Sequence, residues 1–392
     1  MIDFDKKVNR KNTNCFKWDI PEVKQDVIPL WVADMDFEVP KEIIDDLHKR
    51  IDHGIFGYSF PPDSYFQAFI DWQKKRNNWI INKENIVYSS GVVPAIIMAI
   101  TSLTKINDKV LIQTPVYGPF ASAIKDHNRE LVENELIYEN NYYQIDFKNL
   151  EEDLSKNVKM MIFCSPHNPI GRVWKKEELE KILSLCRKYD VILVSDEIHS
   201  DIIFSGYHHY PIAKFANLED KIITLMSPSK TFNIAGLRSS VAVVNNEKIL
   251  RKYKAEFFKY DGHLGNLLGY TGFESAYKYG EKWLNRLIPY LEENVKLVTD
   301  FFEKEFPKIE VTKSEGTFLL WINFENLGLT GTDLQDFFLN EAKVLLDLGT
   351  KYGEKYGNFL RFNIGTNKEI IEESLCRMKK AIQTLEGKWQ VF

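Results

Sequence analysis

Short β-rich runs alternate with helical patterns between about residues 85 and 245. This alternation limits the possible folds more than any other feature, because it is typical of an α/β domain with a mostly parallel sheet. Several runs are almost wholly apolar, as strands covered on both faces should be. We predict seven strands, at Ile86–Ser89, Val110–Gln113, Glu130–Asn134, Met160–Cys164, Val191–Ser195, Ile222–Met226 and Ser240–Val244.

The pattern changes after roughly residue 285. Apolar residues over Leu287–Phe302 recur at helical spacing and predict one long amphipathic helix. An alternating strand is expected within Gly316–Phe324 and another strand at Phe359–Ile364. Thr366 and Glu369 have the spacing of a capping box that begins a last helix. We therefore expect three parts: an N-terminal segment (1–45) packing on a small α+β domain (286–392), and a large domain (46–285).

Composition narrows the range of functions. The 392 residues contain 51 Lys and Arg against 56 Asp and Glu, a formal net charge of −5, which argues against nucleic-acid binding. No stretch has the apolar length of a membrane span, and the polar start lacks a signal-peptide pattern, so a cytoplasmic location is expected. The four cysteines show neither C-x-x-C spacing nor a His-rich companion motif, so no metal site and no disulfide framework is expected.

The most specific segment places a lysine directly after an apolar strand, in the sequence Ser-Pro-Ser-Lys that ends at Lys230. A lysine that holds pyridoxal 5′-phosphate (PLP) covalently needs such a rigid strand end, with phosphate donors nearby. Ser227 and Ser229 can donate hydroxyl groups to the phosphate, and Arg238 can bind it through two hydrogen bonds. Because most lysines are simply solvated, the assignment depends on the neighbouring segments.

A second segment, Val191–His199, brings Asp196 to the carboxyl edge of the predicted sheet, where α/β proteins place their sites. A carboxylate there can pair with a protonated pyridine nitrogen. The alternative is an ordinary N-cap of the following segment. Asp196 and Lys230 together favour the cofactor role.

Other strand ends supply further candidates. Asn168 follows a strand and can hydrogen-bond the cofactor's ring oxygen, although Asn-Pro also marks plain turns. Gly91, Val92 and Val93 begin a helix whose free N–H groups can receive a phosphate, unless the turn is only structural. Tyr117 follows another strand and can stack on a flat ring, although such aromatic residues often belong to the core.

Arg361 lies in an apolar strand of the small domain. A charge in such a place requires a partner. The carboxylate of an amino-acid substrate is a natural one, because a guanidinium matches it with two parallel hydrogen bonds.

These motifs, in this order, resemble the fold-type I PLP enzymes of the class I/II aminotransferase superfamily. The resemblance covers nearly the whole chain and implies the PLP-dependent transferase fold, a mostly parallel seven-stranded sheet plus a smaller α+β domain. Leu30–Phe37, Gly54–Tyr58, Asp196–Asp201 and the pair Val92-Val93 are similar to the cystathionine β-lyase and C–S lyase branch.

The resemblance also implies roles for individual residues. It implies a homodimer with active sites at the interface, in which Tyr58 reaches the phosphate of the partner's cofactor. His199 stands where many aminotransferases have Tyr, and it joins the cofactor-binding residues. The expected catalytic residues are Lys230, Tyr117 and Asp196. The expected substrate-binding residues are Arg361, Asn168, Ala33 and Tyr58.

The implied activity is α,β-elimination from cystathionine or related S-substituted cysteines, which yields a thiol, pyruvate and ammonia. An aminotransferase with the same cofactor and lysine is the alternative, because both reactions begin with removal of the α-proton. A non-catalytic ligand-sensing module of the PLP fold is a second alternative. Such modules normally carry an extra DNA-binding segment, whereas here the family pattern begins within the first few dozen residues.

Overall fold

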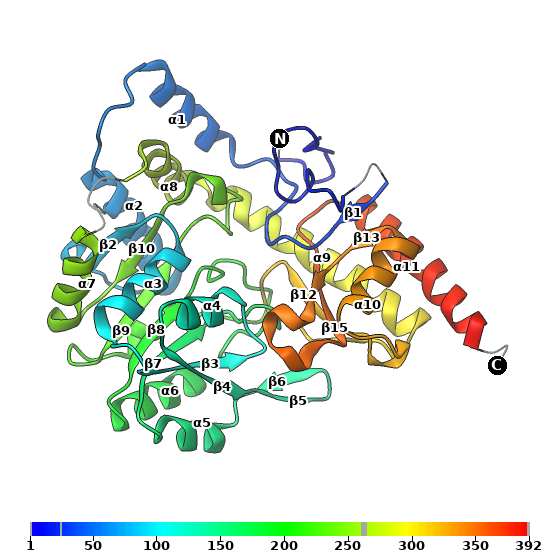
Figure 1. Ribbon diagram of the computed structural model, residues 1–392. Coiled ribbons are helices and arrows are strands. Elements are labelled where there is room, and N and C mark those ends of the chain that lie inside the picture. Colours follow the sequence, from blue (N-terminus) through cyan, green and yellow to red (C-terminus); the bar gives the residue numbers. More distant parts are fainter. Residues whose placement is uncertain (1, 24–25, 260–264, 390–392) are drawn as a thin grey trace.

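A seven-stranded sheet forms the centre of the computed structural model, which describes residues 2–23, 26–259 and 265–389 (Figure 1). The strand order is β2-β10-β9-β8-β7-β3-β4, and only β10 runs antiparallel to its neighbours. All seven predicted strands are confirmed: β2 (Ile86–Ser89), β3 (Lys109–Thr114), β4 (Glu130–Glu135), β7 (Val158–Cys164), β8 (Ile192–Asp196), β9 (Ile222–Met226) and β10 (Ser240–Val243).

Helices cover both faces of this sheet, which explains why its strands are almost wholly apolar. Alternate side chains of β7 enter two different apolar clusters: Met160 and Ile162 face one, Met161 and Phe163 the other. The first cluster includes residues of α3 (Val92–Leu103), α4 (Pro119–Asp126) and α7 (Glu247–Lys259). The second includes residues of α2 (Asp63–Asn77), α5 (Phe147–Leu154), α6 (Lys176–Lys188) and α8 (Leu267–Tyr279).

The C-terminal part builds a second, antiparallel sheet in the order β11-β12-β15-β14. Its strands are β11 (Glu310–Val311), β12 (Leu319–Asn323), β15 (Phe359–Asn363) and β14 (Asp347–Leu348), and its helices are α9 (Glu281–Glu305), α10 (Gly331–Phe337) and α11 (Lys368–Trp389). The predicted long helix is α9. Division into domains at residues 45 and 285 stays a prediction; α9 crosses the second boundary.

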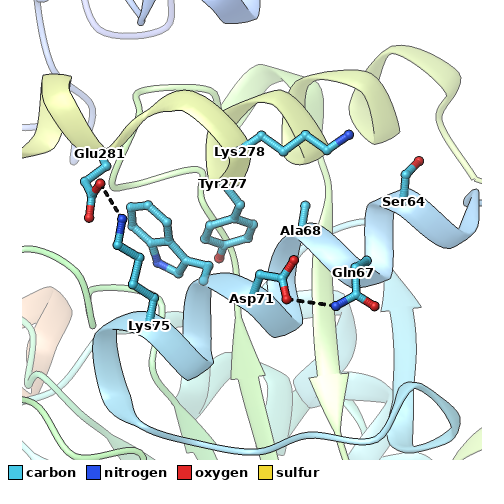
Figure 2. Close-up of a pocket in the computed structure, with 9 residues that line it drawn as sticks. Ser64, Gln67, Ala68, Asp71, Lys75, Tyr277, Lys278 and Glu281 are labelled. Atoms are coloured by element: carbon cyan, nitrogen blue, oxygen red, sulfur yellow. Dashed lines mark hydrogen bonds and ion pairs between the residues drawn. The ribbon is translucent and has the colours of Figure 1, made fainter.

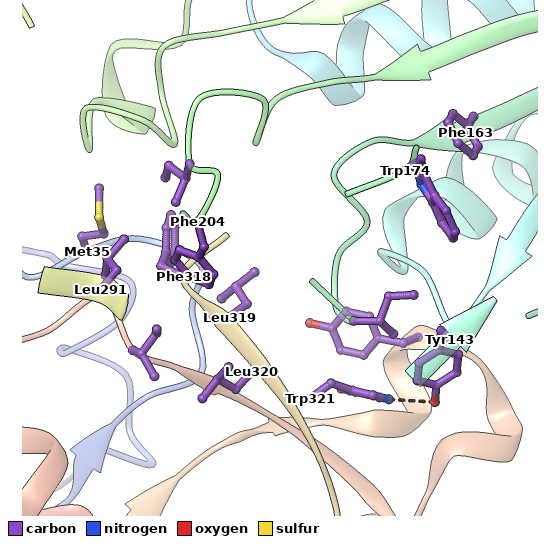
Figure 3. Close-up of a cluster of buried hydrophobic side chains, with 14 of the residues drawn as sticks. Met35, Tyr143, Phe163, Trp174, Phe204, Leu291, Phe318, Leu319, Leu320 and Trp321 are labelled. Atoms are coloured by element: carbon purple, nitrogen blue, oxygen red, sulfur yellow. Dashed lines mark hydrogen bonds between the residues drawn. The ribbon is translucent and has the colours of Figure 1, made fainter. Parts of the chain in front are cut away.

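The expected alternation of β12 is wrong, because all five of its residues are buried. Trp321 points toward the hairpin of β5 (Ile137–Glu139) and β6 (Tyr142–Gln144), where its indole N–H donates to the Tyr143 hydroxyl at 3.2 Å (Figure 3). The neighbouring Leu320 belongs to the same apolar cluster. The strand is therefore covered on both faces, and polar residues are not needed on either.

The predicted capping box at Thr366 and Glu369 is also wrong. The side chain of Asn367 accepts a hydrogen bond from Ile370 N at 3.1 Å and so caps the start of α11. Among the described residues, the buried Thr366 hydroxyl has no hydrogen-bond partner. Glu369 instead forms an ion pair with Lys7 at 2.6 Å. Asn and Thr are both good caps, and the packing of the preceding strand selects Asn.

The N-terminal segment lies along the C-terminal sheet and continues into α1 (Lys41–Asp52). Its strand β1 (Ile28–Pro29) pairs in parallel with β13 (Val344–Leu345). Asn363, in β15, donates to the carbonyl oxygens of Val32 and Asp34 at 2.5 and 2.6 Å and accepts from Gly365 N at 2.7 Å. The segment around Ala33 is thus held by side-chain hydrogen bonds from the small sheet.

Within the described ranges, no helix combines the length and the apolarity needed to cross a membrane.

Replacing Asn363 by Ala should loosen this attachment. The substitution removes both donors to the N-terminal segment and the acceptor for Gly365 N, so we expect a loss of about 1–3 kcal/mol in the free energy of unfolding. Urea titration measures the loss, with the exposed Asn217→Ala as the control. An unchanged unfolding midpoint would show that the segment is held by other contacts.

Candidate active site

The carboxyl ends of five strands surround one cavity of about 280 Å³. Segments that follow β2, β3, β7, β8 and β9 contribute to its wall, together with the N-terminal segment, as the topology of a parallel sheet requires. Twelve of the fourteen residues predicted for the site line this cavity. They are Ala33, Gly91, Val92, Val93, Tyr117, Asn168, Asp196, His199, Ser227, Ser229, Lys230 and Arg238.

Lys230 lies in the turn after β9 and points its amine toward the N-terminal segment. Nζ donates to the carbonyl oxygen of Ala33 at 2.6 Å. Burial, and next the nearby Arg361 guanidinium, lower the pKa of the Lys230 amine to about 8, against the opposing effects of Asp34 and Asp196. The amine therefore loses its proton more readily than an ordinary lysine, which favours a role as nucleophile and general base.

Asp196 is the last residue of β8 and is only 4% exposed. Burial raises the pKa of its carboxyl to about 7, although the Ile198 N–H and Lys230 oppose the shift. Ile198 N donates to Asp196 Oδ1 at 3.1 Å. The carboxyl therefore also caps the backbone that follows β8, as the N-cap alternative expected. A buried carboxylate of this kind gains most from a cationic partner in the cavity.

A helix start and a serine-rich turn form one end of the cavity. Gly91 precedes α3 with φ at 156°, a conformation that side chains disfavour, and the N–H groups of Val92 and Val93 follow it. Ser227 donates its hydroxyl to Ser239 O at 2.7 Å and accepts from Ser229 N at 3.1 Å. The predicted donor Ser227 thus already serves the turn, whereas the helix start remains suited to an anion.

Arg361 lies in β15, behind Asn168, and is buried. Its NH1 donates to Asn168 Oδ1 at 3.1 Å, and its NH2 donates to Trp31 O at 2.6 Å and lies 3.0 Å from Asp347 Oδ2. Among the described residues, its Nε has no hydrogen-bond partner. The guanidinium is thus held in place next to Asn168, but Arg361 itself is not among the residues that line the cavity, although the prediction from the sequence required it to be.

His199 and Tyr117 line the cavity from different strands. Burial, with Lys230 and Arg361 next, holds the pKa of His199 well below its usual range, so the imidazole is neutral. Its Nδ1 has no partner within the described part of the chain. Burial also raises the pKa of the Tyr117 phenol, so it is a proton donor rather than a phenolate at neutral pH.

Two features of the site differ from what the sequence predicted. Tyr58 is 94% exposed and lies outside the cavity lining, so one chain does not bring it to its own site. Asp347, the ion-pair partner of Arg361, was not predicted. The signal that could have found it is its strand, because β14 pairs with β15 and places Asp347 directly opposite Arg361.

Another hollow, of about 410 Å³, lies between α2 and α8 and shows none of this chemistry (Figure 2). Lys75 pairs with Glu281 at 2.6 Å, and Gln67 donates to Asp71 at 2.8 Å. Ser64 and Lys278 pair with Glu274, and none of the predicted site residues lines this hollow.

The residues around Lys230 fit PLP. A lysine amine of lowered pKa, a buried carboxyl that forms no ion pair with any described residue, and a helix start suited to a phosphate share one cavity. The sheet and this site define an α/β enzyme whose cofactor site lies at the carboxyl edge of the sheet.

Comparison with known proteins agrees with a PLP site in an α/β enzyme. The family described as Aminotransferase class I and II matches residues 25–377, and the chain belongs to this family. It is 39% identical to the cystathionine beta-lyase PatB of Bacillus subtilis, over 97% of this chain and 100% of that protein.

Solved structures of the same shape include cystalysin from Treponema denticola, which contains a pyridoxal 5′-phosphate cofactor. It has a TM-score of 0.95 and 41% identity, covering 98% of this chain and 100% of that chain. The PLP-bound C–S lyase of Staphylococcus hominis has a TM-score of 0.92 and 34% identity, covering 97% of this chain and 98% of that chain.

Replacing Asp196 by Asn should stabilise the cofactor-free protein and weaken cofactor binding. Because the folded pKa is raised, the carboxyl lowers stability as the pH rises from about 4 through about 7. Asn does not titrate, so the variant should gain up to about 4 kcal/mol at pH 8 and less at pH 5.

Urea titration of the cofactor-free protein at both pH values tests this, with Asp190→Asn, whose side chain is 82% exposed, as the control. A gain that does not depend on pH would contradict the electrostatic origin.

Proposed function

We propose that this chain is a PLP-dependent carbon–sulfur β-lyase that acts on cystathionine or related S-substituted cysteines. The products are a thiol, pyruvate and ammonia. The observation that carries the proposal is the cavity lined by Lys230, Asp196 and Asn168, with Arg361 hydrogen-bonded to Asn168 next to it. The relatives named as cystathionine β-lyase and C–S lyase support the choice of reaction.

The residues of this cavity would hold the cofactor at both ends and along its ring. Lys230 would attach it, Asp196 would pair with its pyridine nitrogen, and Asn168 would hydrogen-bond its ring oxygen through the amide N–H₂. Gly91, Val92, Val93, Ser227, Ser229 and Arg238 would surround its phosphate, and Tyr117 and His199 would contact the ring. When bound, the group draws electron density away from the substrate's α-carbon.

The chain's own residues would then carry out three tasks. Arg361 binds the α-carboxylate of the substrate and, with Ala33 nearby, fixes the orientation of the α-carbon. The Lys230 amine removes the α-proton, for which its lowered pKa suits it. The β-carbon–sulfur bond breaks and its electron pair leaves with the sulfur, which the Tyr117 phenol would protonate. Water then hydrolyses the remaining three-carbon fragment to pyruvate and ammonia.

Lys230→Ala should abolish turnover while leaving the fold intact. Loss of the base should lower kcat by at least about a thousandfold. The absorbance band of the lysine-bound cofactor should also disappear, and pyruvate release from L-cystathionine measures the rate. Lys221→Ala, directly before β9 and paired with the exposed Asp190, is the control. Near-normal turnover in Lys230→Ala would eliminate Lys230 as the base.

An aminotransferase remains the alternative function, because the same residues would remove the α-proton in both reactions. The enzymes differ in their need for an acceptor. A β-lyase should release pyruvate from cystathionine with no 2-oxo acid added, at the same rate as with one. Turnover that requires a 2-oxo acid would move the assignment to aminotransferase. If the protein takes up PLP but shows neither activity, the assignment moves to the non-catalytic ligand-sensing module.

The proposal includes a homodimer in which Tyr58 serves the partner's site. The loop between α1 and α2 exposes Ile55, Phe56, Tyr58 and Phe60 by 60–94%. Exposed apolar groups of this density are unusual unless another molecule covers them. A hollow of about 740 Å³ beside Tyr58 and Phe60 offers a complementary surface. A cytoplasmic location stays a prediction.

Hybrid dimers test the role of Tyr58. Lys230→Ala and Tyr58→Ala homodimers should each be impaired, whereas random mixing should restore roughly a quarter of the parent activity, since half of the dimers then contain one intact site. Pyruvate release is measured after subunit exchange. No recovery in dimers shown to be hybrid would mean that Tyr58 serves its own chain.

A further inference from the structure

Lys351 lies beside the candidate active site, on a short helix that packs against the turn carrying Tyr117. This helix is η6 (Gly349–Tyr352), and Val116 N donates to Tyr352 O at 3.1 Å. Gly118 permits the approach, because a Cβ there would lie 2.3 Å from the carbonyl oxygen of Lys351. The backbone of η6 therefore packs directly on the Tyr117 turn, and Tyr117 in turn lines the cavity.

The ammonium of Lys351 shares a carboxylate with the buried guanidinium of Arg361. Lys351 Nζ donates to Asp347 Oδ1 at 2.8 Å, and Asp347 Oδ2 lies 3.0 Å from Arg361 NH2. The Tyr352 hydroxyl donates to Asp347 Oδ2 at 2.6 Å and helps to fix the carboxylate. Two cations are thus held with a single carboxylate between them.

Trp31 contacts the same two cations. Its carbonyl oxygen accepts from Arg361 at 2.6 Å, and its ring centroid lies 5.4 Å from Lys351 Nζ. The side chain of Arg361 is 4% exposed, whereas that of Lys351 is 50% exposed. Arg361 is therefore the inner cation, and Lys351 is the outer cation, in contact with solvent.

We propose that Lys351 binds an anionic group at the far end of the substrate's sulfur substituent. The preferred substrates are then S-substituted cysteines whose substituent ends in a carboxylate. This inference rests on the proposed function, because it takes the α-carboxylate to bind Arg361. An ammonium has three donors and Asp347 accepts one, so two remain for a second anion. A neutral substituent of the same length gains no such attraction.

Two nearly isosteric compounds isolate this charge: S-(2-carboxyethyl)-L-cysteine and its carboxamide, S-(2-carbamoylethyl)-L-cysteine. The PLP-loaded enzyme is titrated with each to obtain Kd from the cofactor absorbance, and pyruvate release gives kcat/KM. Lys351→Met should lower the carboxylate-to-carboxamide preference about fivefold in both quantities. Lys351→Arg should retain the preference. Lys355→Met, on the neighbouring η7 (Glu354–Tyr356), is the control, because Lys355 is 74% exposed and pairs with Glu135.

For each variant, Kd and kcat/KM for the carboxylate compound are divided by those for the carboxamide compound. A uniform change in activity does not alter these ratios. A ratio unchanged in Lys351→Met would overturn the proposal. If the ratio is unchanged because both compounds lose affinity and activity equally, Lys351 acts only through Asp347 on Arg361. If the parent enzyme releases no pyruvate from either compound or from L-cystathionine, the β-lyase function fails. The ratio of the two Kd values then still decides the role of Lys351.

Discussion

The buried guanidinium of Arg361 is the constraint on which the arrangement of the whole site depends. An uncompensated charge at that depth costs several kcal/mol, so the chain must surround it with acceptors. Those acceptors come from three distant regions: Asn168 after β7, Trp31 in the N-terminal segment and Asp347 in β14. Satisfying one side chain therefore fixes the large sheet, the small sheet and the N-terminal segment relative to one another around the cavity.

Burial in the cavity also shifts the pKa values of Lys230 and Asp196, the two groups proposed to bind the cofactor. It lowers the pKa of Lys230 and raises that of Asp196, to about 8 and about 7, because it disfavours both charged forms. The charged form of each group is less stable in the folded chain than in water. A bound cofactor would compensate both effects, because Lys230 would hold it covalently and Asp196 would pair with its pyridinium. Such stored instability is typical of functional sites.

Sequence reasoning located residues correctly where their position follows from a strand end. Lys230, Asp196, Asn168 and Tyr117 each end or follow a strand, and parallel strands bring their carboxyl ends to one edge. It failed where the role depends on a neighbour distant in sequence. The cap of α11 is Asn367 rather than Thr366, and the partner of Arg361 is Asp347, which only the pairing of β14 with β15 reveals.

The sequence by itself determined the seven strands, the helices on both faces and most of the residues that line the cavity, because apolar periodicity and strand-end motifs are local properties. Only the tertiary structure decided which of those residues are already engaged, such as Ser227, and that Arg361 Nε has no hydrogen-bond partner among the described residues. It also decided that Tyr58 lies outside its own chain's site and that Lys351 stands beside Arg361. Hydrogen-bond satisfaction and burial depend on every neighbour at once, so they cannot be read along one strand or helix.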